Sequence, residues 1–163
     1  MIYEIKDTNK ISPLFGHWEE TLIWSCLQGI MGKIYANDLT APTAAMAVIG
    51  DFTFFAGEPC PELIAYRPPH CTQNFMIAVP QNKLWENMLT QFYGKKAKII
   101  SRYATKKEPP IFNKHHLEKI VASLPKQYTL SMIDSHFYKL CKSEAWSKDL
   151  VSQFSTYEKY RRL

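Results

Sequence analysis

The chain has 163 residues, of which 46 % are hydrophobic, 13 % aromatic and 21 % charged, and its formal net charge is +5. This composition excludes a disordered, collagen-like or coiled-coil protein, and the length suits one domain or one domain with an appendage. Four cysteines are too few for a disulfide scaffold, and a chain of this length can bury a core without one. We therefore expect all four as thiols.

Targeting and membrane signals are absent from the sequence. The first seven residues lack the apolar segment of a signal peptide. The longest apolar stretches, 21–32 and 39–50, are shorter than the roughly 20 residues that cross a bilayer. These features predict a soluble, cytoplasmic protein with no membrane partner.

The net charge is unevenly distributed along the chain. Residues 1–94 carry five Lys/Arg and nine Asp/Glu, a balance of −4, whereas residues 95–163 carry fifteen and six, a balance of +9. A basic segment of this kind either binds an anionic partner or forms solvated helix faces, and the second explanation is the simpler one. No RNA-recognition motif or zinc knuckle occurs, which disfavours nucleic acid as the partner.

The first third of the chain alternates helical and strand patterns. Apolar spacing predicts a short helix over 11–15, with Asp7 as its N-cap, and a longer helix over 18–31 that Gly32 ends. A short strand over 33–36 is predicted next.

A β-hairpin is predicted after a loop. Its arms are 43–49 and 52–55, and the turn dipeptide Gly50-Asp51 separates them. Pro61 at a first turn then predicts a short helix over 61–66.

The middle of the chain predicts three further elements. An apolar run indicates a buried strand over 75–79, and an amphipathic pattern indicates a helix over 84–92 that Gly94 ends. Alternation of polar and apolar residues predicts another strand over 97–103. The charged, proline-containing segment 106–110 is the best candidate for a subdomain boundary.

The last third reads as mainly helical. Helices are predicted over 117–124, after the cap Asp134, and from Trp146 to Tyr157, with a strand over 128–133 between the first two. The order of elements indicates an α/β or α+β fold, in which helices flank a small mixed β-sheet.

The common catalytic and cofactor motifs are missing. No cysteine or histidine pair has the spacing of zinc ligands, and no nucleophile elbow or glycine-rich phosphate loop occurs. Asp134-Ser135-His136 is not a catalytic triad, because neighbours in a helix do not face each other; Asp134 is better explained as a helix cap. We expect no metal site.

One segment has an unusual sequence, Gly50-Asp51-Phe52-Thr53-Phe54-Phe55-Ala56-Gly57-Glu58-Pro59. With two upstream segments, Ser25 to Gly29 and Gly32 to Asp38, it resembles the N-terminal half of GNAT acetyltransferases of the zwittermicin A resistance type. Weaker similarities continue downstream, at Arg102-Tyr103-Ala104, Leu124-Pro125, Ile133-Asp134 and Trp146-Ser147.

The resemblance implies an enzyme that moves an acetyl group from acetyl-CoA to an amine. It implies a GNAT-like mixed sheet and a pyrophosphate loop at a helix N-terminus, with an R/Q-x-x-G-x-G/A signature in the C-terminal half. The nearest approach here, Gln91 to Lys96, fails at Lys96 and lies at the end of a helix. We therefore expect residues 1–105 to form a GNAT-like N-terminal subdomain. Residues 106–163 would then lead to a C-terminal acetyl-CoA-binding half outside this chain.

No catalytic or cofactor-binding residue can be assigned without that signature. Six polar or aromatic residues in or near the resembling segments are substrate-binding candidates, although turn and core roles are the simpler explanation for them: Trp18, Tyr35, Asp38, Asp51, Phe52 and Glu58. In an amine pocket, the acids Asp38 and Glu58 would bind a cationic acceptor and the aromatic residues would line the wall.

Two functions in different classes follow. In the first, the chain is part of an N-acetyltransferase and packs on a C-terminal GNAT half or on a second copy of itself, so that an apolar surface is exposed in the isolated chain. In the second, it is a non-catalytic GNAT-like binding module, whose basic last third binds an anionic partner in a salt-dependent way.

Overall fold

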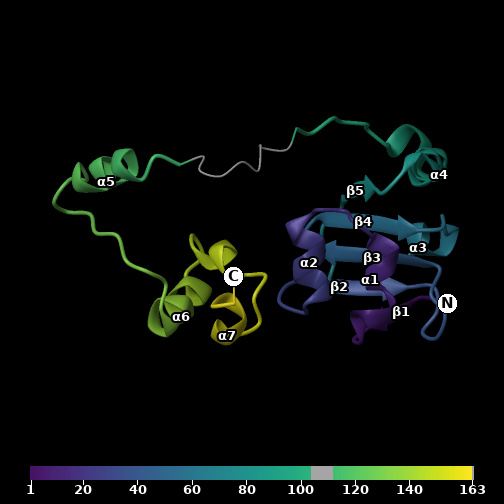
Figure 1. Ribbon diagram of the computed structural model, residues 1–163, viewed down its shortest axis with the longest axis horizontal. Helices are drawn as coiled ribbons and strands as arrows, with labels where there is room; N and C mark the ends of the chain where they lie inside the picture. Colours follow the sequence, from purple (N-terminus) through teal and green to yellow (C-terminus); the bar gives the residue numbers. More distant parts are fainter. Residues whose placement is uncertain (104–111, 163) are drawn as a thin grey trace.

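The computed structural model describes residues 1–103 and 112–162 (Figure 1). Five strands form one mixed sheet in the order β1-β2-β3-β4-β5. The first four strands pair antiparallel, and β5 pairs parallel with β4. The strands are β1 (Tyr3–Ile5), β2 (Lys33–Ala36), β3 (Ala44–Ile49), β4 (Phe52–Gly57) and β5 (Ile77–Pro80).

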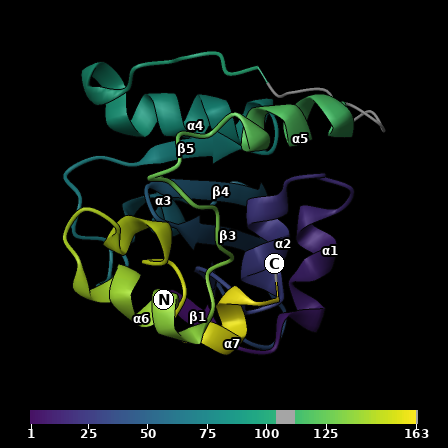
Figure 2. The same cartoon turned by 90° about the vertical axis from the view of Figure 1, so that its left-hand side faces the viewer.

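Helices cover both faces of this sheet, which confirms the predicted fold class. The helices α1 (Ser12–Phe15) and α2 (Thr21–Leu27) contact one face, and α3 (Pro61–Ala65) and α4 (Lys83–Tyr93) contact the other (Figure 2). The α3 helix lies in the connection between β4 and β5, because parallel neighbours need a crossover rather than a tight turn.

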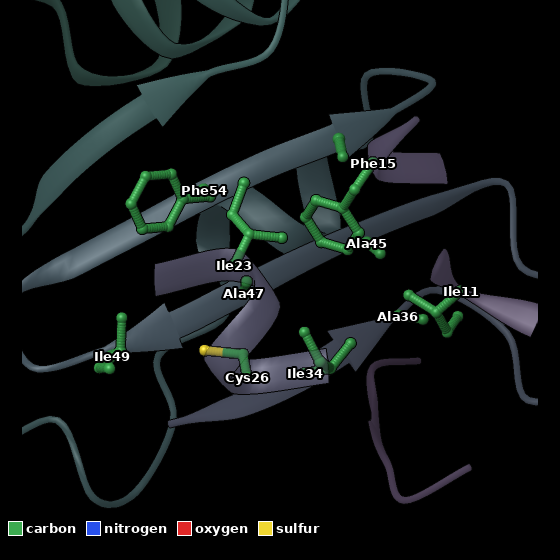
Figure 3. Close-up of a cluster of buried hydrophobic side chains, with 11 residues drawn as sticks. Ile11, Phe15, Ile23, Cys26, Ile34, Ala36, Ala45, Ala47, Ile49 and Phe54 are labelled. Carbon is green, nitrogen blue, oxygen red and sulfur yellow. The ribbon is translucent and has the colours of Figure 1, made fainter. Parts of the chain in front are cut away.

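The alternation of side chains along the strands divides the core into two layers. Ile34 and Phe54 point to the side of α1 and α2, where they pack with Ile23 and Cys26 (Figure 3). Tyr35 and the other alternate residues of β2 to β4 pack on the opposite side, around Trp85 of α4.

The predicted hairpin is confirmed, and a glycine is required at its end. Gly57, the last residue of β4, has φ +79°, and a Cβ there would lie 2.2 Å from the carbonyl oxygen of Thr43. Only glycine tolerates both this dihedral angle and this contact. Gly50 in the turn also has a positive φ of 54°.

Several predicted boundaries in the first part are wrong. The helix predicted over 18–31 extends only over α2, because the Glu20 side chain caps its N-terminus and Gly29, at φ +65°, follows its end. Asp7 caps a 3-10 helix over Thr8–Lys10 that precedes α1. The sequence patterns missed β1, whose three residues are too few to show a period.

The last third contains α5 (Lys114–Ala122), α6 (Ser135–Ser143) and α7 (Tyr157–Tyr160). Asp134 caps α6, as predicted, by accepting hydrogen bonds from two backbone N–H groups of its first turn. A small cluster around Tyr138 and Phe154 joins α6 to α7 and packs against Met31.

The long helix predicted from 146 to 157 is wrong. Its place is taken by a 3-10 helix over Lys148–Leu150 and by α7, and the Thr156 side chain caps α7. The Tyr138 hydroxyl donates to the carbonyl oxygen of Phe154, which draws the intervening chain inward. Helical spacing alone did not reveal this break.

Two predicted strands are absent. Residues 97–103 and 128–133 form no ladder with any described residue, and both segments are almost entirely exposed. Alternation indicates a chain that is suited to a sheet, but it does not supply the neighbouring strand. The predicted linker 106–110 lies outside the described residues. No helix within the described ranges is long and apolar enough to cross a membrane.

Candidate functional site

The six candidate residues lie in separate places on the sheet. Trp18 and Phe52 are on the side of α1 and α2, and Tyr35 is on the opposite side. Asp38 and Glu58 lie at the end of the sheet where β2 and β4 end, whereas Asp51 lies in the β3–β4 turn at the other end. The six-residue strand β4 separates these ends by about 20 Å. The structure therefore does not bring the six into one pocket.

The two aromatic candidates on the α1/α2 side make packing contacts. The Trp18 ring meets Phe54 edge to face, with centroids 5.8 Å apart, and the Phe52 ring stacks on Phe54 at 6.0 Å. The Arg102 guanidinium lies 5.3 Å from the centroid of Phe52. These contacts stabilise the sheet face and explain why aromatic residues occur there.

Tyr35 belongs to a polar pair that the sequence analysis missed. Its buried hydroxyl lies 3.4 Å from Nδ1 of His70, and its ring packs against Tyr66 at 5.3 Å. Burial, reinforced by the charge of Glu4, raises the pKa of the Tyr35 hydroxyl. Tyr35 is therefore protonated at neutral pH. No local pattern links residues 35 positions apart, so only the fold reveals the pair.

The His70 imidazole has the opposite tendency. Burial lowers the pKa of His70, and the nearby positive charge of Lys33 lowers it further. The imidazole is therefore neutral at physiological pH. Depending on its tautomer, Nδ1 of His70 either accepts a hydrogen bond from the Tyr35 hydroxyl or donates one to it.

The acids at the β2/β4 end differ in availability. The carboxylate of Asp38 accepts hydrogen bonds from the N–H groups of Thr40 at 2.6 Å and Ala41 at 2.9 Å. These bonds lower the pKa of Asp38, whose role in the turn is local. Glu58 donates its backbone N–H to the carbonyl oxygen of Thr43, and its side chain is exposed.

Two cavities lie near the sheet. Asp51 lines one of about 30 Å³, together with Arg67 and Cys71. That volume holds about one or two waters rather than a substrate. The other, of about 320 Å³, is open and lies between β1, the end of α2 and α7; Lys6, Lys159 and Glu4 are among its lining residues. None of the six candidates lines this larger cavity.

The end of β4 is held by side chains that the sequence did not single out. Gln81 accepts a hydrogen bond from the N–H of Gly57 and donates one to the carbonyl oxygen of Leu14. The Trp85 indole N–H donates to the carbonyl oxygen of Gly57 at 2.9 Å. Both backbone groups of Gly57 are thus bound by side chains. These hydrogen bonds explain in structural terms why the unusual Gly50–Pro59 segment has a glycine at the end of β4.

Acetyl-CoA binding requires free N–H groups for a pyrophosphate, usually at a helix N-terminus. At four of the described helices, α3 to α6, a side chain or a proline already occupies or removes some of these groups. The side chains of Asn82, Asn113 and Asp134 accept hydrogen bonds from the first turns of α4, α5 and α6. The α3 helix begins at Pro61, which lacks an N–H, and carries the negative Glu62 in its first turn. The N-termini of α3 to α6 therefore fit a pyrophosphate poorly.

Metal ligands do not gather either. Among residues 1–103 and 112–162, no three His, Cys, Asp or Glu side chains lie close enough to hold an ion. The four cysteines are free, and Cys26 and Cys60 are buried. The thiols thus offer no recognisable redox or metal centre.

Comparisons with known proteins identify the family. The chain matches the family described as GNAT acetyltransferase over residues 12–163. It is also similar to the solved structure of a GCN5-related N-acetyltransferase-like protein from Streptococcus suis 89/1591, with 38 % sequence identity and a TM-score of 0.74. The similarity covers 96 % of this chain and 62 % of that one, so the chain spans about 62 % of the length of this relative. No protein of curated function matches. The chain belongs to the GNAT acetyltransferase family.

Proposed function

We propose that this chain is the acceptor-side part of an acetyl-CoA-dependent N-acetyltransferase, and that the acetyl-CoA site lies in a further GNAT half. Family and fold support acetyl transfer in general. One observation supports placing the acetyl-CoA site in a further half rather than in this chain: the N-termini of α3 to α6 are capped or begin with proline. The zwittermicin A resistance type and a cytoplasmic location stay predictions from the sequence.

The proposed partner is a C-terminal GNAT half, with a second copy of the chain as the alternative. The relative from S. suis supports a further half, because 38 % of its length has no counterpart here. We keep residues 1–105 as the N-terminal subdomain and 106–163 as the segment that leads toward the partner.

The acceptor in this proposal is an amine, which is cationic at neutral pH. Of the six candidates, Asp38 and Glu58 are acids at the same end of the sheet, so they are the proposed contacts for that cation. Glu58 is the stronger candidate, because the Asp38 carboxylate already binds two backbone N–H groups. Trp18, Phe52 and Tyr35 lie on the faces of the sheet and keep packing roles.

A thermal-shift titration tests where acetyl-CoA binds. A ligand that binds only the folded state stabilises it by about 2.7 kcal/mol at a hundredfold excess over Kd. We expect no shift specific to acetyl-CoA for the 163-residue chain, with ADP as a control for nonspecific phosphate binding. A specific shift for the chain alone would contradict the proposal.

A hybrid protein provides the positive half of the test. It joins this chain to the part of the S. suis protein that has no counterpart here, in the order of the relative. The hybrid should bind acetyl-CoA and acetylate an amine. Glu58→Gln should raise KM for a cationic acceptor, whereas Glu86→Gln, on α4, should not. Equal KM values would remove Glu58 from the acceptor site.

A second candidate function remains for the basic last third. Lys95, Lys96 and Lys98 are exposed and form no ion pair with a described residue. As a binding module, the chain would bind anionic vesicles of phosphatidylserine or a DNA duplex, with affinity falling steeply between 50 and 200 mM salt. Absent or salt-independent binding removes this candidate.

A further inference from the structure

The segment just before α6 repeats the pattern that opens the chain. Near the N-terminus the order is Tyr3-x-Ile5-x-Asp7, and before α6 it is Leu130-x-Met132-x-Asp134. Both aspartates cap the helix that follows, through hydrogen bonds from backbone N–H groups two residues on. Both segments therefore place an apolar or aromatic residue four and two positions before an aspartate that caps a helix.

The similarity extends past the caps. A tryptophan follows each aspartate at nearly the same spacing, Trp18 after Asp7 and Trp146 after Asp134. Helical turns precede and follow both tryptophans, namely α1 and α2 in the first case, and α6 and the 3-10 helix Lys148–Leu150 in the second. The end of the chain thus has the order of elements that surrounds β1 and α2.

We call residues 3–27 the first unit and residues 128–150 the second unit. The two units differ in whether another strand lies beside their first segment. Beside the first unit, β2 pairs antiparallel with β1, placing Tyr3 opposite Ala36 and Ile5 opposite Ile34. Tyr3 and Ile5 are consequently half-buried. In the second unit Leu130 is 69 % and Met132 89 % exposed, and Figure 1 shows this connection running without a neighbouring strand.

From this difference we infer that residues 128–133 are the unpaired first strand of a second sheet, which docks an antiparallel β-strand from the remainder of the GNAT fold. A strand without a neighbour leaves its N–H and C=O groups free for such an addition. The partner strand should be apolar where it faces Leu130 and Met132, as Ile34 is opposite Ile5. We take this partner strand to come from the part of the fold that corresponds to the uncovered 38 % of the S. suis relative.

The inference rests on the proposed function in one respect only: both assume a further GNAT half, which here supplies the partner strand. A second copy would be a weaker source, since its sheet edges, β1 and β5, are a three-residue and a proline-containing strand. After the second helix of the first unit comes a strand, β2, which pairs with β1, so a further half that repeats this order would supply the strand after α7.

Amide hydrogen exchange tests the pairing. In the free chain, the amides of residues 130–132 should exchange quickly while those of α6 are slower. In the hybrid with the S. suis segment, the amides of 130–132 should slow by on the order of a hundredfold. Protection of these amides in the free chain, as a monomer or as a dimer, would overturn the inference. A folded hybrid in which they still exchange quickly would also overturn it.

A matched pair of substitutions gives a second readout. Leu130→Glu should lower the melting temperature of the hybrid but leave that of the free chain unchanged, because Leu130 is already exposed there. Ser131→Glu should be harmless in both, since the corresponding first-unit residue, Glu4, is an exposed acid paired with Lys33. Equal effects of the two substitutions in the hybrid would contradict the inference. If the hybrid does not fold, the same comparison can be made in the S. suis protein, with the two substitutions placed at the positions aligned with residues 130 and 131.

The two proposals can fail separately. Protection of residues 130–132 without acetyl-CoA binding by the hybrid would leave the strand pairing and remove the proposed function. Acetyl-CoA binding without protection would do the reverse. The exchange and binding measurements together assign either failure to its cause.

Discussion

Replacing Gly57 with alanine tests whether the end of β4 holds the hairpin together. The substitution places a Cβ at φ +79° and 2.2 Å from the carbonyl oxygen of Thr43. An alanine in the left-handed region costs about 1–2 kcal/mol. Relief of the contact requires a backbone shift, with an overpacking cost of about 1–3 kcal/mol. The same shift would weaken the hydrogen bond from Glu58 N–H to Thr43, worth about 1 kcal/mol.

The expected loss of unfolding free energy is therefore about 3–6 kcal/mol. Gly29→Ala is the matched control, because Gly29 has a similar φ of +65° and nothing within 4 Å of its added Cβ. It should cost only about 1 kcal/mol, since the conformational penalty is partly offset by the lower entropy of the unfolded alanine chain.

Urea unfolding followed by circular dichroism measures both variants. With a urea m-value of about 1–3 kcal/mol per molar, Gly57→Ala should lower the midpoint by about 1–3 M more than Gly29→Ala does. Equal midpoints for the two variants would refute the reasoning. They would mean that the hairpin end adjusts freely and that the side chains around Gly57 do not fix its position.

Three further predictions concern groups that the fold brings together. Gln81→Leu should cost about 2 kcal/mol in urea unfolding, because it leaves the Gly57 N–H and the Leu14 carbonyl without partners, whereas Gln91→Leu on the exposed side of α4 should cost much less. Similar losses would contradict this. Because burial lowers the pKa of His70, the unfolded chain binds a proton near pH 6.5 before the folded chain does. Stability should therefore fall as the pH drops below 6.5, and His70→Gln should flatten melting temperatures between pH 5 and 7; an unchanged slope would exclude His70 as the cause. Burial raises the pKa of the Cys26 thiol to about 12, so iodoacetamide at pH 8 should label Cys141 before Cys26, as peptide mass spectrometry can measure, and the reverse order would be incompatible with the buried position.

The sequence was informative wherever a pattern and its partner lie close together in the chain. The β3–β4 hairpin was predicted because its arms are joined by Gly50-Asp51, and a tight turn fixes their pairing locally. The cap at Asp134 and the end of α4 at Gly94 were predicted for the same reason, since the hydrogen bonds involved span only a few residues. The Gly50–Pro59 segment also pointed to the family that the comparisons then identified.

The sequence was less informative about the candidate site. It selected acids and aromatic residues near one segment, but neighbours along a strand point to opposite faces, so Tyr35 and Phe52 are separated by the sheet. It missed His70 and Gln81, because each acts on a residue more than twenty positions away. No local pattern records such a contact.

The tertiary structure decided two questions that the sequence left open. The strands predicted over 97–103 and 128–133 are wrong for the described structure, because a strand forms only where another backbone supplies hydrogen bonds, and none does so among the described residues. Conversely, β1 is too short to show any alternation and exists because β2 lies beside it. The sequence by itself determined the fold class, the hairpin, the cap at Asp134 and the end of α4 at Gly94, since these depend on local hydrogen bonds and on periodicity. The edges of the sheet, the Tyr35–His70 pair and the absence of strands over 97–103 and 128–133 among the described residues depend on which distant segments meet, and only the tertiary structure determines that.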